Sequence, residues 1–196
     1  MKNLFSMMLA LAMALSLSAC DGKDKESENP KPLEYIKIMS FNIRTGTSDR
    51  GTANAWDNRK SGVYEMLNSE QPLIVGLQEA RKFQRTDILA SCPDYAGFGV
   101  CRDTGEDVEG DFNQVQESSI FDVCLKTMYN ARKKAYSTDS KNTYNAWGAS
   151  SNRIIDHIFV SMAYFHVHSY RTLNTPYAGV TYISDHYPIY TTLTFK

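Results

Sequence analysis

The sequence has little surplus charge of either sign, and this argues against one large class of partners. Lysine and arginine together number 21 and aspartate and glutamate 22, so the formal net charge at pH 7 is −1. No overall positive field is therefore available to attract nucleic acid. The chain has only 4 cysteines, none of them spaced as Cys-x-x-Cys, so the paired spacing of common zinc sites is absent. The sequence also contains no internal repeat, which argues against a solenoid or propeller.

Long apolar runs are also missing, apart from one at the N-terminus. Lys2 precedes a mostly apolar run over residues 4–17, which leads through small residues to Cys20. This run is too short to favour a permanent membrane span, and it is typical of a cleaved secretory signal peptide over residues 1–19. The segment LSAC at residues 17–20 resembles the bacterial lipobox, in which the cysteine becomes the acylated N-terminus. The alternative is an ordinary signal peptide whose cysteine is coincidental.

Residues 20–34 are poor in apolar side chains and rich in Lys, Asp, Glu, Asn and Pro. Such a segment cannot bury enough apolar surface to fold, so we expect a flexible tether. The N-terminal patterns together predict an exported lipoprotein, periplasmic or at the cell surface, whose membrane partner is reached through the lipid on Cys20. The remaining residues, 35–196, suffice for a single domain with one core.

Hydrophobic periodicity predicts interleaved strands and helices in this domain. Alternating or continuous apolar patterns predict strands over residues 35–42, 73–77, 95–102, 153–160, 166–172 and 189–195. Apolar residues at helical spacing predict helices over residues 56–67, 81–90 and 120–128. The run at 73–77 is continuous, so that strand is expected to be buried on both faces. The organisation is that of a layered α/β or α+β domain.

Acids and amides follow most of the predicted strands or lead into the next element. Strand ends of this kind converge on one rim of a sheet, where polar side chains can form a site. Gathered oxygen ligands suit a hard cation, Mg²⁺, Mn²⁺ or Ca²⁺, better than a soft metal. The residues concerned are Asn42, Glu79, Asp111, Asn113, Asp156 and Asp185.

Several short motifs follow one another along the domain: MSFNIR at residues 39–44, GLQEA at 76–80, GDFN at 110–113, RIIDHI at 153–158 and SDHYP at 184–188. Any one of them alone would be weak, whereas the whole ordered series is specific. In this series the chain resembles the endonuclease/exonuclease/phosphatase superfamily from residue 35 to residue 196, with one break. The resemblance implies the layered α/β/β/α sandwich of the DNase I-like fold.

The resemblance also implies a metal side of the site. Glu79 would be the principal metal carboxylate, with Asn42 beside it tuning the metal or holding phosphate. Asp185 would support the metal or the nucleophile. The cofactor implied is Mg²⁺, with Mn²⁺ or Ca²⁺ as alternatives.

The remaining implied roles concern water and phosphate. Asp111 would orient or deprotonate the attacking water, and Asn113 would hydrogen-bond a phosphate oxygen. His186 would contact the scissile phosphate, steered by Asp156 through its other ring nitrogen. In-line attack at phosphorus builds charge on the phosphate oxygens, so it needs a cation, an oriented water and fixed donors.

The chain departs from the family pattern in its middle. Gly105 and Glu106, which resemble a family segment near the site, nearly adjoin Asp111, whereas family domains carry a long stretch there. That stretch normally supplies strands, a phosphate-contacting histidine and an acidic loop. We therefore expect the sandwich to be incomplete because central strands are missing, and activity to be impaired to an extent that the sequence does not fix.

The sequence thus predicts a divalent-metal-dependent hydrolase of phosphoester bonds, acting on a substrate of unknown class. The alternative is a noncatalytic, membrane-tethered binding lipoprotein that keeps the family scaffold. No protein partner is implied. Arg44 and Arg102 are candidates for phosphate contacts, whereas Arg59 is expected at the surface. Cys92 and Cys101 flank a predicted strand. In an exported protein they could form a disulfide or stay unpaired, and the sequence leaves both alternatives open.

Overall fold

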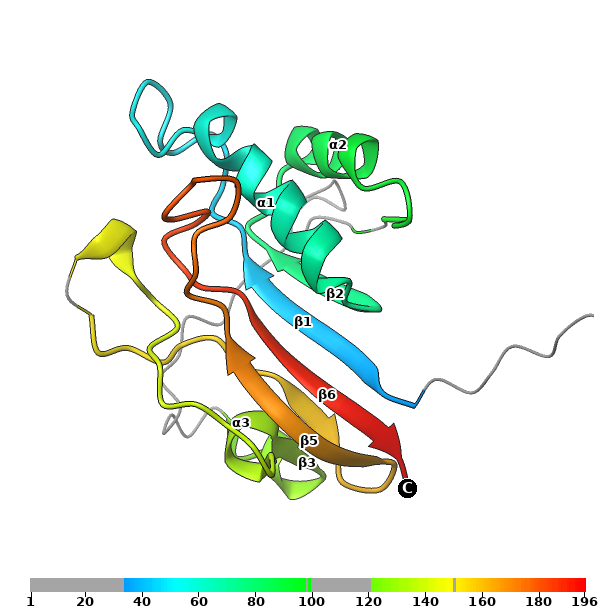
Figure 1. Ribbon diagram of the computed structural model, residues 1–196. Helices are drawn as coiled ribbons and strands as arrows, with labels where there is room; N and C mark the ends of the chain where they lie inside the picture. The colour runs from blue at the N-terminus through cyan, green and yellow to red at the C-terminus, as the bar shows by residue number, and fades with distance from the viewer. Residues whose placement is uncertain (1–33, 98, 100–120, 150) are drawn as a thin grey trace, which may run out of the picture. The chain divides into compact units, whose positions relative to one another are not determined.

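A mixed β-sheet forms the centre of the domain in the computed structural model, which describes residues 34–97, 99, 121–149 and 151–196. Within these residues the sheet is 4-stranded, in the order β2-β1-β6-β5, and a separate 2-stranded sheet joins β3 and β4. The strands are β1 (Ile36–Asn42), β2 (Ile74–Gln78), β5 (Phe165–Thr172) and β6 (Ile189–Phe195), with β3 (Met128–Asn130) and β4 (Phe159–Ser161) in the smaller sheet. Figure 1 shows β6 lying between β1 and β5.

Helices and short turns connect these strands. They are α1 (Trp56–Glu70), α2 (Lys82–Ser91), η2 (Cys124–Lys126), α3 (Ala131–Lys134) and η3 (Ala146–Gly148). Helices combined with a mixed sheet make this an α+β fold, as the sequence predicts. No helix among the described residues is long and apolar enough to cross a membrane.

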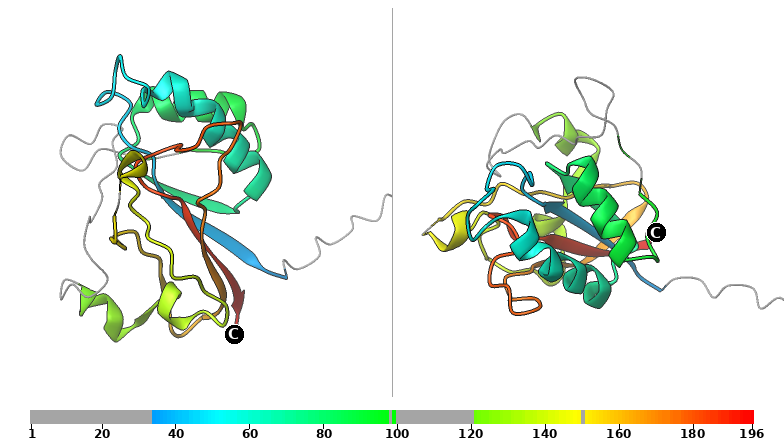
Figure 2. Two further views of the ribbon diagram at one scale, coloured as in Figure 1. Left: turned by 60° about the vertical axis from the view of Figure 1, so that its left-hand side comes forward. Right: turned by 90° about the horizontal axis from the view of Figure 1, so that it is seen from above.

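Successive side chains of β1 point alternately to the two faces of the sheet. Met39 and Phe41 are buried under α1 and α2, whereas Ile36 and Ile38 pack on the opposite face, toward β3, β4 and α3. Figure 2 shows the same arrangement, with α1 and α2 on one face of the sheet. Because successive strand side chains point to opposite faces, one strand contributes to both cores.

α1 buries one face against the sheet. Val63, Met66 and Leu67 recur at helical spacing and are fully or almost fully buried. The helix ends at Gln71, which has a left-handed conformation with φ of 46°. Gly62 allows the close approach of the 177–183 segment, because a Cβ there would lie 2.5 Å from the Cγ2 atom of Ile183.

The prediction that residues 73–77 are buried on both faces is wrong. β2 is an edge strand among the described residues, and Leu73 and Ile74 are 54% and 53% exposed. Only Val75 and Leu77 pack against the core under α1. A cavity of about 410 Å³ lies alongside β2 and α2. A continuous apolar run therefore indicates a strand here but not its place within the sheet.

The predicted helix over residues 120–128 is also wrong within the described residues. Only the short turn η2 forms, and Met128 already begins β3. Val123 and Leu125 are 73% and 42% exposed, so helical spacing of apolar residues did not produce a buried face. Cys124 is half-buried in η2.

Two predicted strands differ from expectation within the described residues. Of residues 153–160, only Phe159 and Val160 lie in β4, and residues 153–158 instead exchange hydrogen bonds with Thr143 and Tyr144. Of residues 95–102, residues 95–97 and 99 form no strand, and the others lie outside the described residues. Cys92 is buried, with its thiol 3.9 Å from the carbonyl oxygen of Tyr64. Cys101 lies outside the described residues, so the disulfide stays a prediction.

Candidate active site

The ends of β1 and β2 meet the segment that leads into β6, and several of the polar residues predicted from the sequence lie there. Asn42 is the last residue of β1, Glu79 follows β2, and Asp185 and His186 precede β6. Ile43 donates a backbone hydrogen bond to Gln78, at 3.0 Å, which joins the two strand ends beyond the sheet. The parallel pairing of β1 with β2 thus places both strand termini on one rim.

The Glu79 carboxylate is held in place by two neighbouring donors. Its Oε1 accepts a hydrogen bond from Asn42 Nδ2 at 3.1 Å, and its Oε2 accepts one from the Thr45 backbone at 3.1 Å. Glu79 has a φ of 59°, in the left-handed region that a residue with a side chain seldom adopts. Strain of this kind is concentrated at functional sites, where the surrounding structure enforces it.

Asp185 is a buried carboxylate in contact with a cation. It is 5% exposed, and its Oδ2 lies 3.4 Å from Nη1 of Arg44. Burial raises the pKa of Asp185 above its ordinary value, and the charge of Glu79 raises it further, whereas His186 and Arg44 act to lower it. The effect of the Glu79 charge on the pKa of Asp185 indicates that the two acids lie near each other.

His186 and Asp156 form a buried pair. The imidazole Nδ1 lies 3.0 Å from Oδ1 and 2.9 Å from Oδ2 of Asp156. A carboxylate only accepts hydrogen bonds, so Nδ1 carries the proton and donates. The Tyr144 ring packs edge-on against the imidazole, with the ring centroids 5.0 Å apart. The contact between His186 and Asp156 that the sequence suggested is therefore present.

The backbone around this pair is fixed by Thr143. Its buried hydroxyl accepts hydrogen bonds from the backbone amides of Ile155 and Asp156, at 2.9 and 3.1 Å. Its carbonyl oxygen accepts a hydrogen bond of 2.7 Å from the backbone of Tyr187, next to His186. One threonine thus connects both halves of the pair, which reduces the freedom of the imidazole relative to the carboxylate.

Arg59 is a residue of this region whose place the sequence analysis missed. It is 1% exposed, not at the surface, and burial lowers its pKa to about 10. Its guanidinium donates to backbone carbonyl oxygens of Ile43, at 2.6 Å, and Ile183, at 3.0 Å, and also to those of Arg44 and Asn54. One sequence pattern did indicate that Arg59 is buried. Its spacing places it on the same face of α1 as Val63 and Met66.

Ser184 and Asn145 also support the site and were not singled out from the sequence. The Ser184 hydroxyl donates to the carbonyl oxygen of Asn42 at 2.7 Å, which joins the segment before β6 to the end of β1. Asn145 donates its backbone N–H to the carbonyl oxygen of Asp185 at 2.8 Å and its side-chain amide to that of Ser184 at 3.1 Å. Ser184 lies inside the SDHYP motif, but no pattern distinguishes its role from that of any small residue.

The remaining predicted residues divide into two groups. Asp111, Asn113 and Arg102 lie outside the described residues, so their placement stays a prediction. Asn42, Glu79, Asp156, Asp185 and His186 are all described and lie around the same rim. Among the described side chains, no group of three or more histidines, cysteines, aspartates and glutamates is arranged to hold a metal ion.

The donor set nevertheless fits a hard cation. Among the described residues, Asn42 donates a hydrogen bond to one oxygen of Glu79 and the Thr45 backbone to the other. A carboxylate has about four acceptor positions, so capacity remains for a cation. Asp185 is a buried acid whose charged form would be stabilised by a neighbouring positive charge. Both are oxygen ligands of the kind that Mg²⁺ and Ca²⁺ prefer. A third carboxylate would have to come from beyond the described residues.

Comparison with known proteins gives a clear result for the fold. No protein-family model matches the sequence, and no curated protein sequence matches it significantly. Among solved structures, it is similar to an endonuclease/exonuclease/phosphatase from Bacteroides vulgatus, with a TM-score of 0.74 and 18% identity over 83% of this chain and 99% of that chain.

Two structures from Bacteroides thetaiotaomicron are similar to the same degree. An endonuclease/exonuclease/phosphatase family protein has a TM-score of 0.72 and 19% identity over 83% of this chain and 98% of that chain. A mannosyl-6-phosphatase has a TM-score of 0.72 and 18% identity over 82% of this chain and 100% of that chain. The chain therefore has the phosphoesterase-like fold of the endonuclease/exonuclease/phosphatase structures.

Proposed function

We propose that this protein is a divalent-metal-dependent hydrolase of phosphoester bonds, a phosphatase or a phosphodiesterase. The observation that carries the proposal is the buried pair of Asp156 and His186, set beside the acids Glu79 and Asp185 at one rim of a sheet. This combination would supply an oriented imidazole and carboxylate oxygens that could bind a cation. The shared fold with phosphatase structures supports the same reaction class.

In this proposal His186 binds the phosphate. Because Asp156 accepts the hydrogen bond from Nδ1, the ring is held with Nε2 as its second hydrogen-bonding atom. Once protonated, the imidazolium donates from Nε2 to a phosphate oxygen, and Asp156 stabilises its charge. That interaction strengthens as negative charge builds on the phosphate in the transition state, which is the condition for catalysis.

The acids on the other side of the rim would hold the cation. Glu79 and Asp185 would supply carboxylate oxygens and Asn42 an amide oxygen, with Mg²⁺ the first candidate and Mn²⁺ or Ca²⁺ next. Such an ion neutralises charge on the phosphate and lowers the pKa of a bound water. Thr45 and Asn42 keep the Glu79 carboxylate oriented before any ion binds.

Two further roles fall to residues outside the described part. Asp111 is proposed to orient or deprotonate the attacking water, and Asn113 to donate a hydrogen bond to a phosphate oxygen. Both assignments rest on the position of the GDFN motif within the ordered series. Arg44 is a candidate for a phosphate contact as well, because its guanidinium lies beside Asp185 at the rim.

The location of the protein is a proposal of the same kind. The signal-peptide pattern over residues 1–19 and the LSAC segment ending in Cys20 support an exported lipoprotein. Residues 20–34 would then act as a tether between the lipid and the folded domain. The membrane is the partner that this arrangement implies, with the protein periplasmic or at the cell surface.

A specific contact favours a second candidate, a noncatalytic binding lipoprotein. Arg44 bonds to both Asp49, at 3.0 Å, and Asp185, at 3.4 Å, and its charge also acts on Glu79. A guanidinium in that position partly neutralises the acids that would hold a metal. If this ion pair persists, the rim would bind anionic ligands without hydrolysing them.

Hydrolysis of chromogenic substrates separates the two candidates. The purified chain is incubated with p-nitrophenyl phosphate and with bis(p-nitrophenyl) phosphate, with Mg²⁺, Mn²⁺ or Ca²⁺ and with a chelator. Release of nitrophenol that depends on the ion supports the hydrolase, and the better substrate separates phosphatase from phosphodiesterase. A folded protein that releases no product with any of these ions would exclude the hydrolase and favour the noncatalytic binding lipoprotein.

A further inference from the structure

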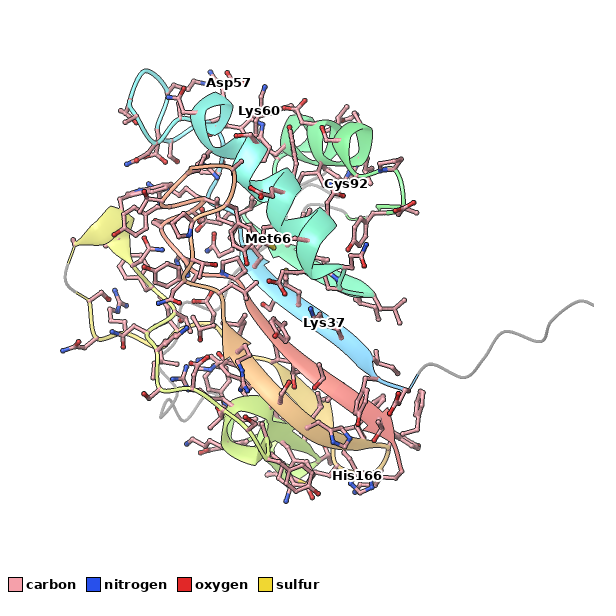
Figure 3. All side chains as sticks on the ribbon, viewed as in Figure 1. Lys37, Asp57, Lys60, Met66, Cys92 and His166 are labelled. Atoms are coloured by element: carbon pink, nitrogen blue, oxygen red, sulfur yellow. The ribbon has the colours of Figure 1, made fainter. Side chains whose placement is uncertain are left out.

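Large exposed hydrophobic side chains gather at the end of the sheet opposite the candidate active site. Tyr35, Tyr136, Tyr164 and Phe195 are 51%, 79%, 66% and 68% exposed, and we refer to them together as the aromatic end. Figure 3 labels His166 in the same region, beside the end of the chain. Exposed aromatic groups of this number are unusual unless the surface binds something.

The strand register places these residues together. Ile36, next to Tyr35, pairs with Leu193 near the end of β6, and Phe165, next to Tyr164, pairs directly with Phe195. The Tyr35 ring lies 5.1 Å from that of His168, and the Tyr136 ring lies 5.9 Å from the same imidazole. The start of β1, the start of β5 and the end of β6 thus meet at the aromatic end.

The aromatic end is ordered by its own contacts. The Phe195 ring packs on Phe165 with centroids 5.1 Å apart, and Lys196 donates its backbone N–H to the carbonyl oxygen of Tyr164 at 3.0 Å. The imidazole of His168 is fixed by Thr194 Oγ1 at 2.8 Å. A surface already ordered in this way loses little conformational freedom on binding.

The chemistry of the aromatic end suits a lipid headgroup region. Tyrosine combines an apolar ring with a polar hydroxyl, and such side chains are enriched where membrane meets water. Three exposed lysines are close in sequence to residues of the aromatic end: Lys133 and Lys134 precede Tyr136, and Lys196 follows Phe195. An exposed acid, Glu34, precedes Tyr35. Basic residues close to a bilayer are attracted to anionic lipids.

The chain enters the domain at this same end. Tyr35 directly precedes β1, and the polypeptide before it leads back to Cys20, the proposed lipidation site. The tether that the sequence predicts over residues 20–34 would have a root-mean-square span of about 20 Å, so a lipid on Cys20 would keep the domain close to the membrane. The candidate site lies at the far end of β1, about 20 Å away for a strand of that length.

We propose that the aromatic end rests on the bilayer that holds the N-terminus, which turns the candidate active site toward the aqueous side. This inference rests on the proposed anchoring at Cys20 and not on hydrolysis. It gives the tethered domain a fixed orientation, so that access to the site does not require the domain to leave the membrane surface.

Fluorescence quenching in vesicles tests the orientation. The full chain is reconstituted in phosphatidylethanolamine/phosphatidylglycerol vesicles with and without brominated acyl chains, and the tryptophan added by Tyr164→Trp is followed. Phe83→Trp is the matched control, because Phe83 is an exposed aromatic residue, 39% exposed, beside Gly46 at the active-site end. Bromine should reduce the added emission of Tyr164→Trp and leave that of Phe83→Trp unchanged, since docked side chains reach the acyl boundary.

Equal quenching of both variants, or quenching of neither, would overturn the proposal. A second variant, Tyr136→Ser/Tyr164→Ser/Phe195→Ser, removes three of the four residues of the aromatic end without changing the candidate site. In the wild-type chain, hydrogen exchange of residues 164–168 should slow when vesicles are added, and this slowing should be lost in the triple variant. Slowing that survives the triple substitution contradicts the proposal, and far-ultraviolet circular dichroism checks that the variant is folded.

Discussion

The imidazole Nδ1 of His186 lies 2.9 and 3.0 Å from the carboxylate oxygens of Asp156, and both side chains are almost fully buried. Asp156→Asn keeps the shape of this pair but removes the negative charge that fixes and stabilises the protonated ring. We expect kcat to fall by roughly 100-fold or more, because positioned acid–base and donor groups contribute at least that much.

The pH dependence of the rate distinguishes this role from a structural one. In Asp156→Asn the imidazole of His186 loses the carboxylate that it contacts, so the dependence of the rate on pH should differ from that of the wild-type chain. Asp57→Asn is the control, because Asp57 is an exposed carboxylate on α1. An unchanged profile in Asp156→Asn would contradict the proposed role of the pair.

Substitution of Arg59 is expected to lower the stability of the fold. Its guanidinium satisfies backbone carbonyl oxygens in the loops after β1 and before β6, and Arg59→Met leaves these oxygens buried without that donor. We expect the free energy of unfolding to fall by about 3 kcal/mol or more, since several charge-assisted hydrogen bonds are lost together. Urea denaturation measures the change.

Lys60→Met is the control for Arg59→Met. Lys60 is the next residue of α1, and its ion pair with Asp57 is solvent-exposed, so its loss should change the free energy of unfolding by less than about 0.5 kcal/mol. Equal effects of the two substitutions would show that Arg59 does not support the rim in the way the contacts indicate.

The exposed edge of β2 gives a prediction about solubility. Ile74 is 53% exposed on an edge strand, so Ile74→Lys should change the free energy of unfolding by no more than about 0.5 kcal/mol. A lysine on an edge strand also hinders pairing with other chains, so light scattering on heating should decrease. A loss of stability of several kcal/mol would instead mean that β2 is covered on both faces.

The proposed lipidation is tested at Cys20. Cells that express the chain are supplied with a labelled fatty acid, and label should appear in the wild-type protein and be absent from Cys20→Ser. Label in both proteins, or in neither, would contradict the assignment of Cys20 as the acylated residue.

Sequence patterns identified some elements because the physical signal was local. β1 and β6 alternate apolar and polar residues, and β6 has the bounds that alternation predicts, Ile189–Phe195. α1 shows the spacing of a helix with one buried face. Strong periodicity therefore specified the type of element, although α1 continues to Glu70, beyond the end that its apolar face indicates.

Other features depend on neighbours that no local pattern reveals. The exposure of Leu73 and Ile74 follows from the edge position of β2, and the apolar residues around η2 have the spacing of a helix without forming one. The burial of Arg59 depends on carbonyl groups from segments distant in sequence. Such outcomes are decided by tertiary contacts, which override local preference.

Part of the placement of the candidate residues was predictable, whereas their roles stay predictions. The ordered motifs indicated Asn42, Glu79, Asp156, Asp185 and His186, and these residues lie at one rim. The support from Ser184 and Thr143 was not predictable, since serine and threonine occur in many settings and only the three-dimensional contacts distinguish these two.

The dependence of phosphoester hydrolysis on Mg²⁺ in Glu79→Gln tests the central claim most directly. Initial rates are measured across a Mg²⁺ titration for the wild-type chain, for Glu79→Gln and for Glu65→Gln, an exposed glutamate of α1 that serves as the control. We predict saturable activation by Mg²⁺ in the wild type and in Glu65→Gln, and little or no activity in Glu79→Gln at any Mg²⁺ concentration. Equal activation of Glu79→Gln and the wild type would contradict the proposed site.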